Sequence, residues 1–562
     1  MTVARRVDAI VVGSGITGGW AAKELTERGL TVLMIERGSN IEHIRDYTRE
    51  HRAPWELPFR GLGDRKRYER DYASARQSSS FVEGNEHFWA KDSEQPYASD
   101  PERPFVWLRG GGLGGRSLLW GRQSYRWSDL DFEANAEDGH GIDWPIRYRD
   151  IASWYDHVES FIGVSGRAEG LPQLPDGVFQ PPMEFNCVEH LAKERIEAAF
   201  DDRILTIGRV AVLTRELHGR APCHYCGPCY HGCSTGSYFS TQSSTLPAAR
   251  ATGRLTLRTD TIVEKIDYDP RTRRATGVRV VDATTGERGS FQARVVFLCA
   301  STLASTRILL NSRPEAFPKG LGNSSGVVGH YLMDHTLGMS GVGLVFGFED
   351  RDTLGNRPNS FYIPRFRNLR GPRSDFVRGY GYQGYASRLG WTRGLSAPGF
   401  GKELKESLRK PGPWRLMLIG LGECLPRYEN SATLDPKRVD RWGIPQLAIS
   451  FSHAENERRM QVDAAEQAAA MLELCGARHI RTSAELSVGG HAIHEMGTAR
   501  MGSDPRTSAL NDYNQCHDVP NLFVTDGSCM TSSACQNPSL TYMALTARAS
   551  AHAVEEMQRG AI

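Results

Sequence analysis

The chain has 562 residues, of which 40% are hydrophobic and 24% are charged. This is an ordinary globular composition, and the length favours two or more packed domains. The formal net charge is +2, from 68 basic and 66 acidic residues, which gives no reason to expect a nucleic acid or an anionic membrane as a partner. The apolar runs have the length of strands and fall short of the roughly 20 residues that cross a bilayer, so we expect no transmembrane segment.

The N-terminal segment contains Arg5 and Arg6, a pair that could be mistaken for a twin-arginine export signal. Asp8 comes soon after the pair, and the short apolar stretch beyond it runs directly into a glycine-rich turn. We therefore interpret this stretch as the first strand of the fold and expect no export signal on this chain.

The next elements are typical of a dinucleotide site. A buried strand runs into Gly13, Gly15 and Gly18, which have the GxGxxG spacing. The first glycine allows a tight turn, the second admits a pyrophosphate, and the third lets the following helix pack on the strand. That helix offers free N–H groups to the phosphates, and a second strand ends at Glu36, where a ribose hydroxyl needs an acceptor. An ordinary glycine turn without nucleotide is the alternative, and the motif alone does not distinguish FAD from NAD.

Four of the 11 cysteines form one tight cluster: Cys223, Cys226, Cys229 and Cys233. Thiolates with this spacing on a turn-rich loop can converge on an iron–sulfur cluster. Ser234 stands where bacterial ferredoxins usually have proline. An odd number of cysteines with a single cluster argues against a secreted disulfide framework. Zinc, disulfides and a site without metal remain as alternatives, although zinc sites usually split their ligands into two separated pairs.

Two further segments resemble a known family. Residues 109–122 resemble the second glycine-rich loop of glucose-methanol-choline (GMC) oxidoreductases, which in that family runs beside the flavin pyrophosphate and ring. Residues 521–548 resemble its C-terminal FAD and active-site segment. The resemblance covers nearly the whole chain except roughly 340–480. In these two segments it implies FAD contacts by Arg109, Gly114, Gly115, Ser117, Asp526, Gly527 and Pro538.

The resemblance also implies the fold. We expect an α/β architecture, with a Rossmann-like FAD-binding domain and an inserted, sheet-based substrate domain. The FAD domain is expected to be discontinuous, and the expected segments are 1–60, 105–165, 205–330 and 485–562. The substrate domain is expected to comprise 166–204 and 331–484.

A histidine and an asparagine are the expected catalytic residues. His494 and Asn537 lie in segments that resemble those around the catalytic pair of pyranose oxidases and glucoside 3-dehydrogenase-type sugar dehydrogenases. A neutral imidazole is a suitable base for a hydroxyl proton, and an asparagine can hydrogen-bond the same oxygen without competing for that proton. His491 is a lesser candidate, and we interpret His330 and His335 as structural.

One departure from the family pattern concerns the flavin linkage. Pyranose oxidases attach FAD covalently to a histidine, and Leu119 stands at the matching position here. We therefore expect FAD to be bound non-covalently. Pro538, directly after Asn537, suits the first position of a helix whose N-terminus stabilises the reduced flavin ring.

The resulting hypothesis is an FAD-dependent dehydrogenase that oxidises a secondary hydroxyl of a sugar or glycoside, with carbon 3 preferred. Electrons are expected to leave through a 3Fe-4S or 4Fe-4S cluster to an external acceptor. The alternatives are a pyranose or C-glycoside oxidase that uses oxygen, and a flavin-bound carrier or assembly subunit without turnover.

The resemblance finally implies partners. Related sugar dehydrogenases pair with a small subunit that bears a twin-arginine signal, and they pass electrons to a cytochrome or another redox protein. We therefore expect a heteromeric enzyme that is co-exported to the periplasm, with a cytoplasmic enzyme as the alternative.

Overall fold

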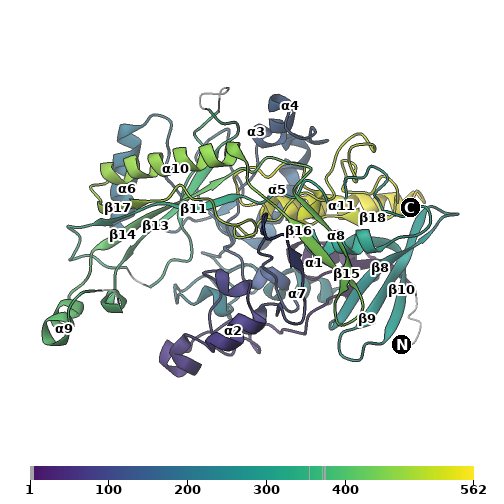
Figure 1. Ribbon diagram of the computed structural model, residues 1–562, viewed down its shortest axis with the longest axis horizontal. Helices are drawn as coiled ribbons and strands as arrows, with labels where there is room; N and C mark the ends of the chain where they lie inside the picture. Colours follow the sequence, from purple (N-terminus) through teal and green to yellow (C-terminus); the bar gives the residue numbers. More distant parts are fainter. Residues whose placement is uncertain (1–5, 354, 370, 372–374, 396) are drawn as a thin grey trace.

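The computed structural model describes residues 6–353, 355–369, 371, 375–395 and 397–562. These residues form two lobes, each built on one large β-sheet (Figure 1). The seven-stranded sheet lies in the lobe that holds both chain termini, and the six-stranded sheet lies at the other end of the long axis. None of the described helices is long and apolar enough to cross a membrane.

The sheet of the first lobe joins strands from both ends of the chain. In spatial order its strands are β7 (Leu255–Arg258), β2 (Val32–Ile35), β1 (Val7–Val12), β10 (Arg288–Leu298), β9 (Arg274–Asp282) and β8 (Thr261–Asp269), with β18 (Leu522–Val524) paired to β10. Strand β1 runs parallel to β2 and β10, and β18 runs parallel to β10. Strands β9 and β8 form an antiparallel extension. The parallel part is the Rossmann-like arrangement that the N-terminal motif predicts.

Strand β1 is buried on both faces, as expected for a continuous apolar run in a parallel sheet. Ala9 and Val11 pack in a core with helix α1 (Ile16–Glu27), whereas Ile10 and Val12 belong to the core on the opposite face. Helix α11 (Ser539–Gln558) packs against α1 and against α5 (Tyr148–Ile162). The first and last helices of the chain therefore lie in one layer.

The second lobe contains an antiparallel sheet covered by helices. In spatial order its strands are β17 (Arg478–Thr482), β11 (Thr336–Val345), β14 (Trp414–Gly422), β13 (Tyr380–Arg388), β12 (Phe361–Ile363) and β6 (Thr206–Ile207). Helices α10 (Glu455–Leu474) and α6 (Cys187–Ala199) pack on one face (Figure 1). On β13, Tyr382 points to this face and donates a hydrogen bond to the Ala464 carbonyl of α10. Because side chains alternate along a strand, the neighbouring Gln383 points to the opposite face.

Smaller elements complete the described chain. The short sheets are β15 (Ser431–Val439), β16 (Pro445–Ser450) and β3 (Ala98–Ser99), and the pair β4 (Val164–Ser165) and β5 (Phe179–Gln180). The other α-helices are α2 (Arg65–Asp71), α3 (Asp129–Phe132), α4 (Ala134–Asp138), α7 (Thr245–Ala251), α8 (Thr302–Asn311) and α9 (Gly401–Arg409).

The predicted fold class is confirmed, but two elements do not follow the expected domain boundaries. Strand β6 falls in the expected FAD segment 205–330, yet it pairs with β12 of the second lobe. The β15–β16 hairpin falls in the expected substrate segment 331–484, yet it packs on α8 of the first lobe. An ion pair of 2.6 Å between Arg307 on α8 and Asp440 fixes this hairpin there.

Candidate active site

A cavity of about 350 Å³ extends from the ends of β1, β2 and β10 to the N-terminus of α11. Most of the residues that we expected at the cofactor or the substrate line it: Gly13, Gly15, Glu36, Arg109, Gly115, Ser117, His494, Asp526, Gly527, Asn537 and Pro538. Two expected cofactor residues, Gly18 and Gly114, do not line it. Residues from both ends of the chain therefore meet at one site.

The glycine turn shapes one end of the cavity. A Cβ on Gly18 would stand 2.0 Å from the Gly13 carbonyl oxygen, so this glycine allows the helix to pack on the strand. Gly15 is the N-cap of α1, and apart from its chain neighbours no protein atom lies within 4 Å of where its Cβ would be. The backbone at Gly15 is therefore open to the cavity, and the N-terminus of α1 offers its free N–H groups there.

Glu36 closes the end of β2. Its carboxylate accepts hydrogen bonds from the Ser14 backbone N–H (3.1 Å), the Ser14 hydroxyl (2.5 Å) and the Gly38 backbone N–H (2.8 Å). Burial raises its pKa above the ordinary value. The acidic residue thus lies where a ribose acceptor is expected, held by the glycine turn itself.

The second glycine-rich loop forms another wall. Ser117 donates to the Gly114 carbonyl at 2.6 Å, and the Gly114 backbone N–H donates to the Ser14 hydroxyl at 2.9 Å. Gly114 therefore joins the two glycine-rich loops instead of lining the cavity. Arg109 lines the cavity while paired with Asp92 at 2.6 Å.

The C-terminal segment supplies the opposite wall. Asp526 accepts hydrogen bonds from Ser305 and Ser528 and is followed by Gly527. Pro538 is the N-cap of α11, one residue before the first helical position that we expected for it. Helices α1 and α11 therefore both direct their N-termini at the cavity, which suits a ligand with a pyrophosphate and an electron-accepting ring.

Two buried polar atoms in the lining fit a bound cofactor. Tyr542 and Glu495 line the cavity, and the Tyr542 hydroxyl and one carboxylate oxygen of Glu495 have no hydrogen-bond partner among the described residues. Buried polar groups are normally paired, so these atoms and the open backbone at Gly15 point to a polar ligand. FAD fits this set of groups, with the α1 end for its pyrophosphate and the α11 end for its ring.

His494 and Asn537 lie side by side at the α11 end. The Asn537 side-chain nitrogen is 3.3 Å from His494 Nε2. The pKa of His494 is held well below 6.5, first by burial and then by the nearby His335 and Arg116. His494 is therefore neutral at ordinary pH, which is the form that can accept a proton.

His491, the lesser candidate, and His335, one of the two histidines interpreted as structural, are placed differently. His491 does not line the cavity, and its Nε2 contacts Gln77 at 3.1 Å near the surface. His335, which we interpreted as structural, lies directly against His494, with 2.9 Å between the two Nδ1 atoms. Burial lowers the pKa of His335 to about 4.

Two neighbours of the pair were missed by sequence reasoning. Asp334 accepts the backbone N–H groups of Gly490, Ala492 and His494 at 2.7, 3.2 and 3.1 Å, and thereby shapes the segment that carries His494. Gln383 donates to the Asn537 side-chain oxygen at 2.5 Å. Gln383 lies in the stretch where we recognised no motif, so only its alternation with Tyr382 on a strand could have suggested that it faces away from the core.

The cysteine cluster lies next to this site. Cys229 belongs to a single 3-10 turn with Tyr230, and Tyr230 lines the cavity with the Arg122 guanidinium 5.3 Å from its ring centre. All 11 cysteines are free thiols, and burial raises the pKa of Cys223 to about 11. Within the described ranges, no three His, Cys, Asp or Glu side chains are grouped so that they could hold a metal ion. The four clustered cysteines are therefore not arranged as metal ligands in this structure, and the iron–sulfur assignment stays a prediction.

Comparison with known proteins identifies the family. Models of the GMC oxidoreductase family match residues 7–337 and 426–546. The chain belongs to the GMC oxidoreductases. This confirms the predicted family and makes the protein an FAD-dependent oxidoreductase that acts on CH–OH groups.

Individual proteins show how broad this similarity is. The 2-methyl-1,2-propanediol dehydrogenase of Mycolicibacterium austroafricanum is 30% identical, over 98% of this chain and 95% of that protein. The fructose dehydrogenase large subunit of Gluconobacter japonicus is 24% identical over 98% of each chain. The crystal structure of pyridoxine 4-oxidase from Mesorbium loti has a TM-score of 0.61 at 16% identity, and it covers 98% of this chain and 99% of that one. The solved structure shares the fold, and the three proteins are named for different alcohols.

Proposed function

We propose that this enzyme is a dehydrogenase that oxidises a secondary hydroxyl of a sugar or glycoside, with carbon 3 of a glycoside as the preferred position. The observation that carries the proposal is the neutral His494 beside Asn537, at the α11 end of the cavity. The resemblance of this pair to those of pyranose oxidases and glucoside 3-dehydrogenases supports a sugar, as does the similarity to a fructose dehydrogenase large subunit.

The two side chains have distinct parts in the reaction. A substrate hydroxyl placed against both side chains accepts a hydrogen bond from the Asn537 amide and gives its proton to His494. FAD, when bound, supplies the acceptor for the hydride of the same carbon. The Asn537 amide keeps the oxygen in place as the carbonyl forms, without taking up the proton itself.

Anaerobic flavin reduction tests the proposal. The purified yellow protein is mixed with a panel of sugars, glycosides and simple diols, and the flavin absorption is recorded before and after. We expect bleaching by a sugar or glycoside. Bleaching by diols alone would contradict the sugar assignment, and no bleaching by any alcohol would favour the carrier alternative.

The catalytic pair is tested by substitution. His494→Ala should lower the rate of flavin reduction by about 10²- to 10⁴-fold, because the base is lost. Asn537→Ala should cost less, about 10- to 10²-fold, because only a hydrogen bond is removed. His491→Ala is the matched control, and its rate should be unchanged because its side chain lies outside the cavity.

The electron acceptor distinguishes the dehydrogenase from the oxidase. We propose an external acceptor, and we propose Cys223, Cys226, Cys229 and Cys233 as the ligands of a 3Fe-4S or 4Fe-4S cluster on the strength of their spacing. Iron and acid-labile sulfide analysis of anaerobically purified protein tests this assignment. Protein without iron that turns over rapidly with oxygen would favour the pyranose or C-glycoside oxidase.

We also propose a heteromeric enzyme in the periplasm, with a small subunit that carries a twin-arginine signal and a cytochrome or other redox protein as acceptor. The similarity to a large subunit of fructose dehydrogenase supports the heteromer. Expression of this chain alone and with its neighbouring genes, followed by cell fractionation, tests both points. A fully active cytoplasmic enzyme formed by this chain alone would contradict them.

A further inference from the structure

A buried backbone carbonyl determines where the proton of His335 lies. His335 Nε2 is 3.0 Å from the Ser533 carbonyl oxygen, and the histidine is fully buried. A carbonyl oxygen can only accept a hydrogen bond, so His335 Nε2 carries a hydrogen. Because burial lowers the pKa of His335 to about 4, the ring is neutral near pH 7 and has no second hydrogen. Its Nδ1 is therefore a hydrogen-bond acceptor.

This assignment determines the tautomer of His494. His335 Nδ1 is 2.9 Å from His494 Nδ1, and the two rings are nearly perpendicular, at 77°. Since His335 Nδ1 can only accept, His494 Nδ1 must donate. A neutral His494 with a hydrogen on Nδ1 has its free lone pair on Nε2, the atom that faces Asn537.

The hydrogen bonds keep the same donor-to-acceptor direction through Asn537 and into the second lobe. The amide nitrogen of Asn537 donates to His494 Nε2 at 3.3 Å, which leaves the amide oxygen to accept a hydrogen bond. Gln383 on β13 provides the donor at 2.5 Å. Four consecutive hydrogen bonds therefore run in one direction, from Gln383 through Asn537, His494 and His335 to Ser533.

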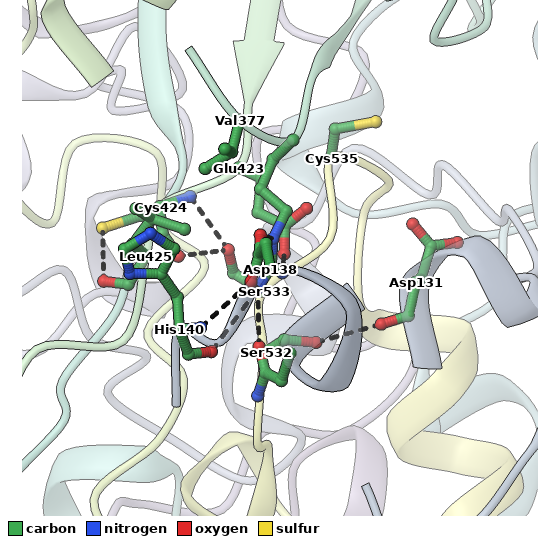
Figure 2. Close-up of polar contacts among 12 residues, drawn as sticks. Asp131, Asp138, His140, Val377, Glu423, Cys424, Leu425, Ser532, Ser533 and Cys535 are labelled. Atoms are coloured by element: carbon green, nitrogen blue, oxygen red, sulfur yellow. Dashed lines mark hydrogen bonds and ion pairs between the residues drawn. The ribbon is translucent and has the colours of Figure 1, made fainter. Parts of the chain in front are cut away.

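The acceptor residue at the end of this series is itself held by hydrogen bonds. The Ser533 hydroxyl donates to the Cys424 carbonyl at 3.0 Å and accepts the Cys424 backbone N–H at 3.0 Å (Figure 2). Both residues are buried. These two bonds hold the Ser533 side chain against Cys424, next to the carbonyl that His335 contacts.

We propose that His335 is a positioning residue that holds His494 in the Nδ1–H tautomer, and that Gln383 holds the Asn537 amide in the matching orientation. The base is thereby ready to accept a proton at Nε2 before any substrate binds. In a histidine, the hydrogen bond made by one ring nitrogen sets the state of the other. The role in turnover depends on the proposed function of His494, whereas the tautomer itself does not.

Neutron diffraction from deuterium-exchanged crystals of the holoenzyme tests the tautomer without any substrate. We expect deuterium on His335 Nε2 and on His494 Nδ1, none on His494 Nε2, and the two deuterons of the Asn537 amide on the side of His494. Deuterium on His494 Nε2 in place of Nδ1 would overturn the proposal. Because this measurement involves no turnover, it remains decisive even if no sugar is a substrate.

Substitution tests the consequence for the reaction with whichever alcohol reduces the flavin. His335→Phe removes the acceptor, so we expect the limiting rate of flavin reduction to fall by about 10- to 10²-fold, less than for loss of the base, with the substrate dissociation constant unchanged. His335→Asn retains an oxygen near the position of Nδ1 and should recover part of this rate. Equal losses in both variants, or a His335→Phe variant that reduces its flavin at the original rate, would overturn the role in turnover.

His330→Phe is the matched control. His330 lies in the same segment and also contacts a backbone carbonyl, that of Tyr428 at 2.9 Å, but it has no contact with His494. Its substitution should leave the rate unchanged. Should the His335→Phe variant fail to fold, the neutron result and the comparison of His335→Asn with the original enzyme still decide the proposal, since the asparagine retains a polar group at the buried site.

Discussion

His494 must be neutral to accept a proton, and its burial and two of its neighbours favour that form. Burial lowers its pKa, and the nearby His335 and Arg116 lower it further. Glu495, adjacent in the chain, is paired with Arg116 at 2.7 Å, so its negative charge is balanced and does not favour a protonated imidazole. Asp334 accepts backbone N–H groups, including that of His494.

These surroundings predict the pH dependence of flavin reduction. A base with an ordinary histidine pKa would lose half its rate at about pH 6.5. Because the pKa of His494 is lowered, the rate should stay on its plateau there and fall only at clearly lower pH, where His494 becomes protonated. Anaerobic stopped-flow reduction at saturating substrate, over a range of pH, measures this. An acid limb at or above the ordinary histidine pKa would contradict the assignment of His494 as a buried, neutral base.

A second prediction at the residue scale concerns Leu119. This side chain lines the cavity where pyranose oxidases have the histidine that carries their flavin. A leucine has no nucleophilic atom, so FAD should be held by non-covalent contacts alone. Acid precipitation should therefore leave the yellow colour in the supernatant. Flavin that remains in the protein pellet would show that another residue forms a covalent bond.

At the scale of single elements, two glycines of the turn between β1 and α1 have different roles. Gly18 is required for packing, and Gly15 for contact with the ligand. Gly18→Ala would place a Cβ 2.0 Å from a backbone oxygen, so it should lower the melting temperature even of the apoprotein. Gly15→Ala would meet no protein atom within 4 Å apart from its chain neighbours, so the apoprotein should keep its melting temperature. Its Cβ would instead extend toward the pyrophosphate, and the FAD content should fall. Differential scanning calorimetry and flavin absorption measure both effects, and equal behaviour of the two variants would contradict this difference in roles.

The elements that sequence could predict are those whose function requires a local pattern. The spacing of Gly13, Gly15 and Gly18 predicts a dinucleotide-binding turn. The unbroken apolar run before the turn predicts a buried strand. Gln383 offers no such signal, because its partner Asn537 is 154 positions away and the intervening fold brings them together. The contact of His335 with His494 likewise depends on how two loops pack, so the family segment around His335 indicated only a structural residue.

At the scale of the whole molecule, the hydrogen-bonded series from Gln383 to Ser533 crosses from one lobe to the other. The second lobe thus supplies a residue, Gln383, that orients the catalytic pair. The β15–β16 hairpin makes the opposite crossing, because Ile444 lines the cavity at the end where Glu36 and Arg37 also lie. Domain boundaries placed along the sequence predict neither the contact of Gln383 with Asn537 nor the position of the β15–β16 hairpin on the first lobe.

The position of helices α1 and α11 in one layer has a consequence for biosynthesis. Strand β18 and helix α11 complete the sheet and the cavity begun by β1 and α1, so a nascent chain lacks part of the flavin site until residues 522–558 have been synthesised. Flavin loading should therefore follow the emergence of these residues from the ribosome. Chains truncated after 515 should bind no FAD, whereas the separately synthesised segment 516–562, added in trans, should restore some yellow colour if the rest of the sheet has formed. Stalled ribosomes that display truncated chains carrying FAD would show that the first half of the site is enough to capture the flavin during synthesis.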